Sequence, residues 1–246
     1  EQLYTDPVLL HYNIRRIHHS MFFAPVKSLI AEALEVFTHM DENTSSKDYN
    51  EMLFLLGGNL GVLSGDFQFA EEWLSKADAF AAKIGNRDFQ SRSARKKADL
   101  LCLAGKEKDA LDLINEFVTI DTPLNSRYEI YLLGALAETY RQLNEIDKAV
   151  YSFNKLLSVT QLKGLSGWLC HAYLGLAHTI QISTEADYQK VLAYLSQADE
   201  IYKRTGQAWG IINSEIVRFS AMKSIDISSI ILYHSFLFCQ YQKLGK

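Results

Sequence analysis

Apolar residues between positions 53 and 77 fall into two short runs, each with the spacing of one face of an α-helix. In both runs they recur at intervals of four and then three residues. The predicted buried positions are Leu56, Leu60 and Leu63 in the first run and Ala70, Leu74 and Ala77 in the second. The Ser-Gly-Asp segment at 64–66 separates the runs and supplies a turn. The stretch therefore predicts a helical hairpin.

Three glycines, Gly57, Gly58 and Gly61, lie on the first helix of this hairpin. Glycine is costly inside an isolated helix because its backbone loses the most freedom on folding. It is reasonable where a neighbouring helix approaches closely, so we expect these glycines to form a seam with the second helix. We do not expect a nucleotide-binding loop here, because the glycines follow a helical pattern rather than a strand.

The same hairpin pattern recurs further along the chain at a nearly constant period. Four equivalent positions define the repeats: Ala70, Ala110, Ala149 and Val191. They are 40, 39 and 42 residues apart. Gly105 and Asn144 mark the turns of two later copies, and Gly85 is expected to end a helix in the left-handed conformation.

This pattern predicts an all-α fold, a right-handed superhelical solenoid of about six antiparallel helix pairs. We expect a single repeat domain over residues 1–246, without strands. The predicted hairpins span residues 6–40, 51–84, 91–120, 126–161, 166–204 and 208–244. The first should begin at Asp6, which caps a helix whose first residue is Pro7.

The order of small residue, turn, and then Ala-x3-(Leu/Ile/Phe)-x2-(Ala/Phe/Leu) resembles the tetratricopeptide repeat (TPR). The resemblance covers residues 51–205. Two features depart from the family pattern: the period is longer than about 34 residues, and the consensus tryptophan is missing at the start of each copy. The resemblance implies that the first helix of each repeat lines a concave groove that binds a protein or peptide. It does not identify the ligand.

Composition and charge narrow the class of protein. The 246 residues carry a formal net charge of −4 and are 48 % hydrophobic, which favours neither direct nucleic-acid binding nor a disordered chain. No run approaches the roughly 20 apolar residues of a membrane span, and no secretory signal is visible. Cys102, Cys170 and Cys239 are an odd, scattered set, so we expect a reducing, cytoplasmic location. The chain begins with Glu1 rather than Met, which suggests a piece of a longer protein.

A cluster of basic residues lies at the start of one repeat's first helix, where the resemblance implies exposure to the groove. The candidate groove residues are Asn59, Arg92, Arg95, Lys96, Asp99, Tyr131, Glu138 and Arg141. Arginines beside an asparagine can grip a carboxylate, and the set partly resembles the dicarboxylate clamp of chaperone-binding repeats. The match is incomplete, because Leu56 stands where the clamp has asparagine. The alternative is a solvated basic face.

We expect no cofactor, no metal and no catalytic site. His18 and His19 are adjacent and point to different faces of a helix, and no acid or cysteine joins His11 and His18 at ligand spacing. The sequence contains no Gly-x-Ser-x-Gly, Gly-x4-Gly-Lys-Ser/Thr or His-Glu-x2-His motif. An enzyme with an active site in the groove is the weaker alternative, for want of a catalytic constellation.

The last predicted helix, within residues 228–244, is apolar nearly all round. A terminal solenoid repeat normally has a polar outer face. We therefore single out Ile231, Phe236 and Phe238 as a surface for a partner or a homodimer. The alternative is that this helix folds back and is covered by its neighbours.

The segment from Ala198 to Ile211, ADEIYKRTGQAWGI, resembles repeats in bacterial signalling ATPases of the STAND class, including the maltose-type transcription activators. The resemblance implies the ligand-sensing repeat region of a signalling or transcription-regulating protein, separated from its ATPase. We therefore expect a non-enzymatic recognition module for a protein, a peptide or a small inducer. The alternatives are a stand-alone quorum-type peptide-sensing regulator domain and a chaperone-like TPR adaptor.

Overall fold

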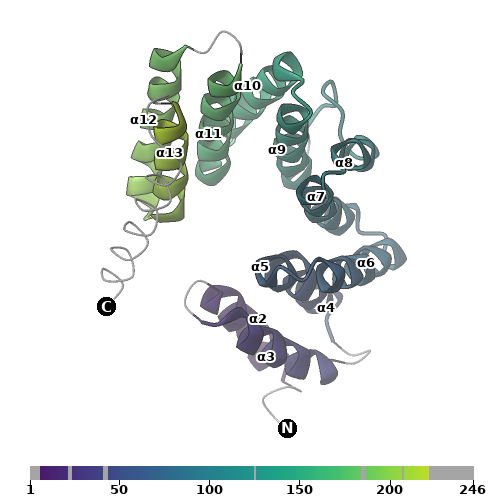
Figure 1. The fold of residues 1–246 in the computed structure, drawn as a ribbon. Coiled ribbons are helices and arrows are strands. Elements are labelled where there is room, and N and C mark those ends of the chain that lie inside the picture. The colour runs from purple at the N-terminus through teal and green to yellow at the C-terminus, as the bar shows by residue number, and fades with distance from the viewer. Residues whose placement is uncertain are drawn as a thin grey trace. The chain divides into compact units, whose positions relative to one another are not determined.

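The computed structural model of the protein describes residues 6–21, 24–40, 44–124, 126–183, 187–206 and 208–221 (Figure 1). Every regular element in these ranges is a helix, and they contain no strand, which confirms the all-α prediction for them. None of the helices in these ranges combines the length and apolar character needed to cross a membrane. The chain divides into two compact units, residues 1–117 and 118–246.

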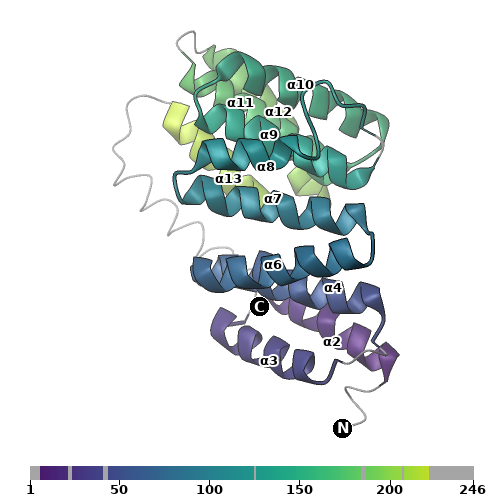
Figure 2. The ribbon, with the colours of Figure 1, turned by 90° about the vertical axis from the view of Figure 1, so that its right-hand side faces the viewer.

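The N-terminal unit is a series of helices that pack against their neighbours in the chain when α4, η1 and α5 are counted as one helix. In chain order these are α2 (Pro7–Ser20), α3 (Val26–Thr38), α4 (Ser46–Phe54), η1 (Leu55–Gly61), α5 (Val62–Ser64), α6 (Phe67–Lys83), α7 (Arg87–Leu103) and α8 (Glu107–Asn115). Segments α4, η1 and α5 follow one another without a break and form one continuous helix. Figure 2 shows α6 lying between α4 and α7, and it contacts both.

The C-terminal unit repeats the same arrangement. Its helices are α9 (Arg127–Gln142), α10 (Ile146–Leu162), α11 (Ser166–Ile182), α12 (Tyr188–Thr205) and α13 (Ala208–Ala221). Consecutive helices contact each other, and so do α9 with α11 and α11 with α13. First helices of successive hairpins therefore lie side by side. The grouping into six hairpins and the handedness of the array remain predictions. Residues 228–244, with the predicted surface of Ile231, Phe236 and Phe238, lie outside the described ranges.

Polar side chains close the starts of several helices. At the start of α2, the Asp6 carboxylate accepts a hydrogen bond from the backbone N–H of Val8 at 2.8 Å, which confirms the cap predicted at Asp6. Ser126 and Glu129 form a reciprocal capping box at the start of α9. These bonds satisfy N–H groups that have no partner inside the helix.

The predicted turn residues end their helices in the left-handed conformation. Gly85, Gly105 and Asn144 have φ values of 67°, 71° and 58°. After α6, the N–H of Asn86 bonds back to the carbonyl of Ala81 at 2.9 Å, the closing bond of a helix that ends at such a residue. The prediction for these three turns is confirmed.

The four aligned positions occupy equivalent places in the fold. Each is the fourth residue of the second helix of its hairpin, and each is at most 1 % exposed: Ala70 in α6, Ala110 in α8, Ala149 in α10 and Val191 in α12. The period of about 40 residues is therefore the distance along the chain between successive second helices.

The glycine-rich helix differs from the prediction in its winding. Residues 55–61 form a π-helix, whose hydrogen bonds close wider turns than those of an α-helix. Leu56 and Leu60 are fully buried, but Leu63 is 55 % exposed, so its predicted burial is wrong. The wider turns change the angular phase of the residues that follow, which moves Leu63 off the face that the α-helical spacing predicts.

Two of the three glycines lie where α6 approaches this helix, as predicted. A Cβ atom on Gly57 would lie 2.6 Å from the backbone nitrogen of Leu74, and one on Gly61 would lie 2.8 Å from the Cα of Ala70. Gly58 belongs to another contact, because its Cβ would meet the Phe54 ring at 3.0 Å and the Lys96 side chain at 3.3 Å. The seam with α6 is therefore made by two glycines rather than three.

Candidate functional site

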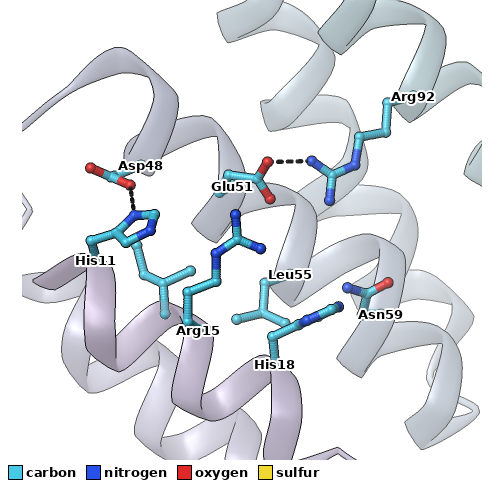
Figure 3. A pocket seen from close by; sticks show the side chains of 9 residues that line it. His11, Arg15, His18, Asp48, Glu51, Leu55, Asn59 and Arg92 are labelled. Atoms are coloured by element: carbon cyan, nitrogen blue, oxygen red, sulfur yellow. Dashed lines mark hydrogen bonds and ion pairs between the residues drawn. The ribbon is translucent and has the colours of Figure 1, made fainter. Parts of the chain in front are cut away.

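A small polar hollow lies in the N-terminal unit, among α2, α4, η1 and α7 (Figure 3). The side chains that line it are His11, Ile14, Arg15, His18, Asp48, Glu51, Leu55, Asn59 and Arg92. We call it the N-terminal hollow. Its volume of about 30 Å³ is small, since pockets that enclose a whole small molecule span about 300–1,000 Å³. A ligand would therefore place a single polar group here rather than its whole body.

Helical spacing places the lining side chains on common faces. On α2, His11, Arg15 and His18 follow one another at four and then three residues. Along the continuous helix of α4 and η1, the lining residues Glu51, Leu55 and Asn59 recur every four residues. Arg92 comes from α7 and completes the rim (Figure 3).

One end of the N-terminal hollow is fixed by an aspartate held at both of its oxygens. His11 Nδ1 lies 2.7 Å from Asp48 Oδ1, and the hydroxyl of Ser45 donates to Asp48 Oδ2 at 2.6 Å. Burial alone would raise the pKa of Asp48, but the hydrogen bonds from His11 and Ser45 outweigh it and hold this pKa below its ordinary value. Asp48 is therefore a carboxylate whose two oxygens are both already engaged in hydrogen bonds.

The other end carries a second ion pair. Arg92 Nη1 donates to Glu51 Oε1 at 2.6 Å, and the Arg92 guanidinium carbon lies 3.8 Å from the centroid of the Phe54 ring. The side chains of Arg92 and Glu51 are 21 % and 20 % exposed. The guanidinium is therefore held by a carboxylate and an aromatic face together.

Between these two pairs, Arg15 carries a charge that is not neutralised by a direct partner. Its side chain is exposed, and no residue in the described part of the chain forms an ion pair or hydrogen bond with it. Figure 3 shows its guanidinium pointing toward the Glu51 carboxylate, while His18 and Asn59 face each other on the other side of Leu55. Burial, together with the charges of His19, Arg92 and Arg15, lowers the pKa of His18. At neutral pH, His18 is therefore a neutral hydrogen-bonding group.

Of the predicted groove residues on η1 and α7, Asn59 and Arg92 line the N-terminal hollow and the others do not. Lys96 Nζ lies 3.7 Å from Asp99 Oδ2, and burial lowers the pKa of Lys96 despite this neighbour. Arg95 is half-buried on the same helix. Helical spacing alone predicted all five residues in the groove. It could not distinguish Asn59 and Arg92, which line the N-terminal hollow, from Arg95, Lys96 and Asp99, which do not.

The remaining predicted groove residues belong to the C-terminal unit. The ring of Tyr131 stacks on that of Trp168, with centroids 4.3 Å apart and planes 23° apart. Arg141 donates to Glu138 through Nε at 3.1 Å and also through Nη2. Whether these residues share one groove with Asn59 and Arg92 stays a prediction.

Burial and neighbouring charges also shift acid–base groups of the C-terminal unit. Burial acts to raise the pKa of Glu138, but its hydrogen bond and ion pair with Arg141 outweigh it and leave this pKa lowered. Burial is the main cause that lowers the pKa of His178, and the charge of Arg141 adds to it. This region therefore favours a charged carboxylate beside a neutral imidazole.

Sequence reasoning found Arg92 but missed the other charged residues of the N-terminal hollow, Arg15, Asp48 and Glu51. The spacing of His11, Arg15 and His18 on one helix face was readable and could have flagged Arg15. The pairings of His11 with Asp48 and of Arg92 with Glu51 link residues 37 and 41 positions apart, which no local pattern reveals. Across the described ranges, no three His, Cys, Asp or Glu side chains are grouped so that they could hold a metal ion.

Comparisons with known proteins relate the chain to solved helical-repeat structures. No family model matches the chain, and the search of curated proteins found no match. The structure of BtubC (BKLC) from P. vanneervenii aligns with a TM-score of 0.58 and 15 % identity, covering 84 % of this chain and 86 % of that one.

A putative kinesin light chain from Podosopora anserina, with nearly identical TPR-like repeats, aligns with a TM-score of 0.53 and 15 % identity over 82 % of this chain and 99 % of that one. A glutamine-to-methionine variant under the same description aligns with a TM-score of 0.56 and 16 % identity over 82 % and 98 %. At these identities the likeness is one of fold. The chain therefore has the fold of TPR-like helical repeats.

Proposed function

We propose that this chain is a non-enzymatic recognition module that binds a protein or peptide segment and anchors an acidic group of it in the N-terminal hollow. The observation that carries this proposal is Arg15, an exposed residue that lines the hollow together with Asn59 and His18 and forms no hydrogen bond or ion pair with the described part of the chain. A guanidinium and an amide together offer the planar donors that a carboxylate accepts.

The pairing of charges in the N-terminal hollow leaves Arg15 as the group that could bind an anion. Glu51 forms an ion pair with Arg92, and both oxygens of Asp48 already hold hydrogen bonds from His11 and Ser45, so neither carboxylate is without a partner. Arg15 is then the charged side chain of the hollow that has no direct partner in the described part of the chain. Because the hollow holds little more than one polar group, the rest of the ligand would lie along the surface around it.

Two further features support binding to a protein or peptide rather than to a small metabolite. The fold is that of TPR-like repeats, and the TPR resemblance of the sequence implies protein partners. The half-buried Tyr131 and Trp168 of the C-terminal unit are of the residue types that dominate binding energy at protein interfaces. Tyr131, Glu138 and Arg141 remain our candidates for a second set of ligand contacts.

The regulatory setting is also part of the proposal. The resemblance of residues 198–211 to sensor repeats of bacterial STAND-class ATPases supports a ligand-sensing role in a signalling or transcription-regulating protein. A stand-alone peptide-sensing regulator domain is the alternative. Both roles share the same requirement, which is capture of a ligand by the repeats.

The test uses two pools of randomised pentapeptides that differ only at the C-terminus, one with a free carboxylate and one amidated. We expect the immobilised protein to retain the free-carboxylate pool more strongly. The double variant Arg15→Gln/Arg92→Gln should lose that preference, because it removes both guanidinium groups. Arg16→Gln is the matched control, since Arg16 neighbours Arg15 but pairs with Glu32 outside the hollow. Equal retention of both pools by the wild-type protein would contradict the proposal.

A further inference from the structure

We infer that Glu51 is a built-in competitor at the N-terminal hollow, which occupies Arg92 until the anionic group of a ligand takes its place. This inference rests on the function proposed above and assigns the residue that limits the affinity of the site for an anion. Its basis is a difference between the two carboxylates of the hollow, Glu51 and Asp48, in how firmly each is held.

Asp48 is held at both oxygens, by His11 at 2.7 Å and by Ser45 at 2.6 Å. Glu51 is held at one oxygen, by Arg92 at 2.6 Å, and its Oε2 makes no hydrogen bond with the described part of the chain. Glutamate also has one more rotatable side-chain bond than aspartate, so its carboxylate can swing away while α4 stays in place. Glu51 is therefore the carboxylate that can leave.

Arg92 keeps its place when Glu51 leaves. Its guanidinium carbon lies 3.8 Å from the centroid of the Phe54 ring, and Phe54 is only 5 % exposed, so the ring is a fixed platform. The side chain of Arg92 is 21 % exposed, which means that most of its stem is packed. A ligand anion would therefore meet a guanidinium that is already oriented.

A ligand carboxylate and Glu51 cannot share Arg92 without a cost. Two carboxylates about 4 Å apart repel, and the repulsion is several times stronger at a partly buried site than in bulk water. Nη2 and Nε of Arg92 are open in the described structure, but a group bound there would still feel the charge on Glu51. A ligand carboxylate must therefore either displace Glu51 from Arg92 or bind despite the repulsion from the charge on Glu51. Both cases lower the affinity for the ligand.

The experiment measures binding of one defined probe, the peptide acetyl-Ala-Ala-Ala-Glu with a free C-terminus, by titration calorimetry at low salt. Glu51→Gln keeps the shape of the side chain and removes its charge, so we expect the affinity to rise about tenfold. Glu72→Gln is the matched control, since it removes the same charge from the exposed pair with Lys76 on α6 and should leave the affinity unchanged. Glu51→Ala serves as the second variant if Glu51→Gln does not fold.

The role of Arg92 is tested by adding Arg92→Gln to Glu51→Gln. If Glu51 acts by occupying Arg92, the gain seen with Glu51→Gln should disappear in the double variant, because the two residues are coupled. A gain that persists without Arg92 would show a general charge effect and would overturn the inference.

The outcomes separate this inference from the function on which it rests. A wild-type protein that binds the probe with the same affinity as Glu51→Gln, or more tightly, would overturn the competitor role and leave the recognition function standing. Binding by Glu51→Gln alone would support the inference, since the competitor then masks the site in the wild type. If no form binds any peptide with a free carboxylate, the proposed function fails and this inference fails with it.

Discussion

The ring of Phe153 in α10 occupies the space that a side chain at Gly175 of α11 would need. A Cβ atom built on Gly175 would meet three carbon atoms of this ring at less than contact distance. Phe153 is fully buried, so the ring has no route into solvent. Helices α10 and α11 therefore pack at a separation that a glycine makes possible.

Gly175→Ala should destabilise the protein by about 1–3 kcal/mol, because the added methyl group forces the ring or the helix to shift. The free energy of unfolding in urea measures the effect. Gly167→Ala on the same helix is the matched control, since no atom lies within 4 Å of the place where its Cβ would be. Equal stability of the two variants would show that the Phe153 contact can relax without cost.

Asn50 in α4 should be replaceable by leucine without loss of stability. Its side chain is fully buried, and neither its Oδ1 nor its Nδ2 has a hydrogen-bond partner in the described part of the chain. An unsatisfied buried amide costs about 1–3 kcal/mol, so we expect Asn50→Leu to be neutral or stabilising by up to about that amount. Asn50→Ala should instead destabilise, because it leaves a cavity. A large loss in Asn50→Leu, measured in urea, would mean that the amide has partners in solution.

The stability of the protein should fall as the pH drops below about 6.5, with His178 as one cause. Burial, followed by the charge of Arg141, lowers the native pKa of His178 below its ordinary value of 6.5, while Glu138 acts in the opposite direction. In this range the unfolded chain binds more protons than the native protein. The contribution of His178 to the free energy of unfolding is therefore fully present above the pKa that His178 has in the unfolded chain. It is lost as the pH falls through the lower pKa that His178 has in the native protein.

The free energy of unfolding measured from about pH 7 to pH 5 should show a shallower loss for His178→Gln than for the wild type. His18 acts in the same direction in the N-terminal unit, so part of the loss should remain in this variant. The lowered pKa of Glu138 affects stability at more acidic pH. The stability that Glu138 contributes is lost as the pH falls below 4.5, the ordinary pKa of its side chain, and through its lowered native pKa. Parallel profiles for the wild type and His178→Gln would contradict the assignment.

Cys170 should resist thiol reagents in the native protein. Burial raises the pKa of its thiol to about 11, and the residue is fully buried, so little thiolate is present or accessible at pH 8. Cys102 is partly exposed. In a Cys239→Ser background we expect Cys102 to react with Ellman's reagent at least about tenfold faster than Cys170, and both to react in urea. Similar native rates for the two thiols would contradict this expectation.

Local patterns in the sequence were sufficient to find the helices and their repeat. The four aligned positions at Ala70, Ala110, Ala149 and Val191 are all buried at the same place in their helices. Caps and turn residues could be read as well, at Asp6, Gly85 and Asn144. These features depend on residues within one or two turns of the chain, so a single sequence contains the information that sets them.

The burial of Leu63 was mispredicted because helical spacing assumes one winding throughout. Residues 55–61 adopt the wider π-helix, in a segment where Gly57 and Gly61 let α6 approach closely. The π-helical winding occurs where residues 55–61 contact α6. The apolar pattern of a single helix carries no information about such a contact with another helix.

The sequence by itself determined an all-helical chain of hairpin repeats, with the positions of its turns and most of its buried faces, because these follow from local periodicity and capping. Only the tertiary structure decided which charges meet. It joined Asp48 to His11 and Glu51 to Arg92, and it left Arg15 between them without a partner in the described part of the chain. Charged side chains pair across helices according to how those helices pack, so the candidate site appears only after the fold has brought α2, α4, η1 and α7 together.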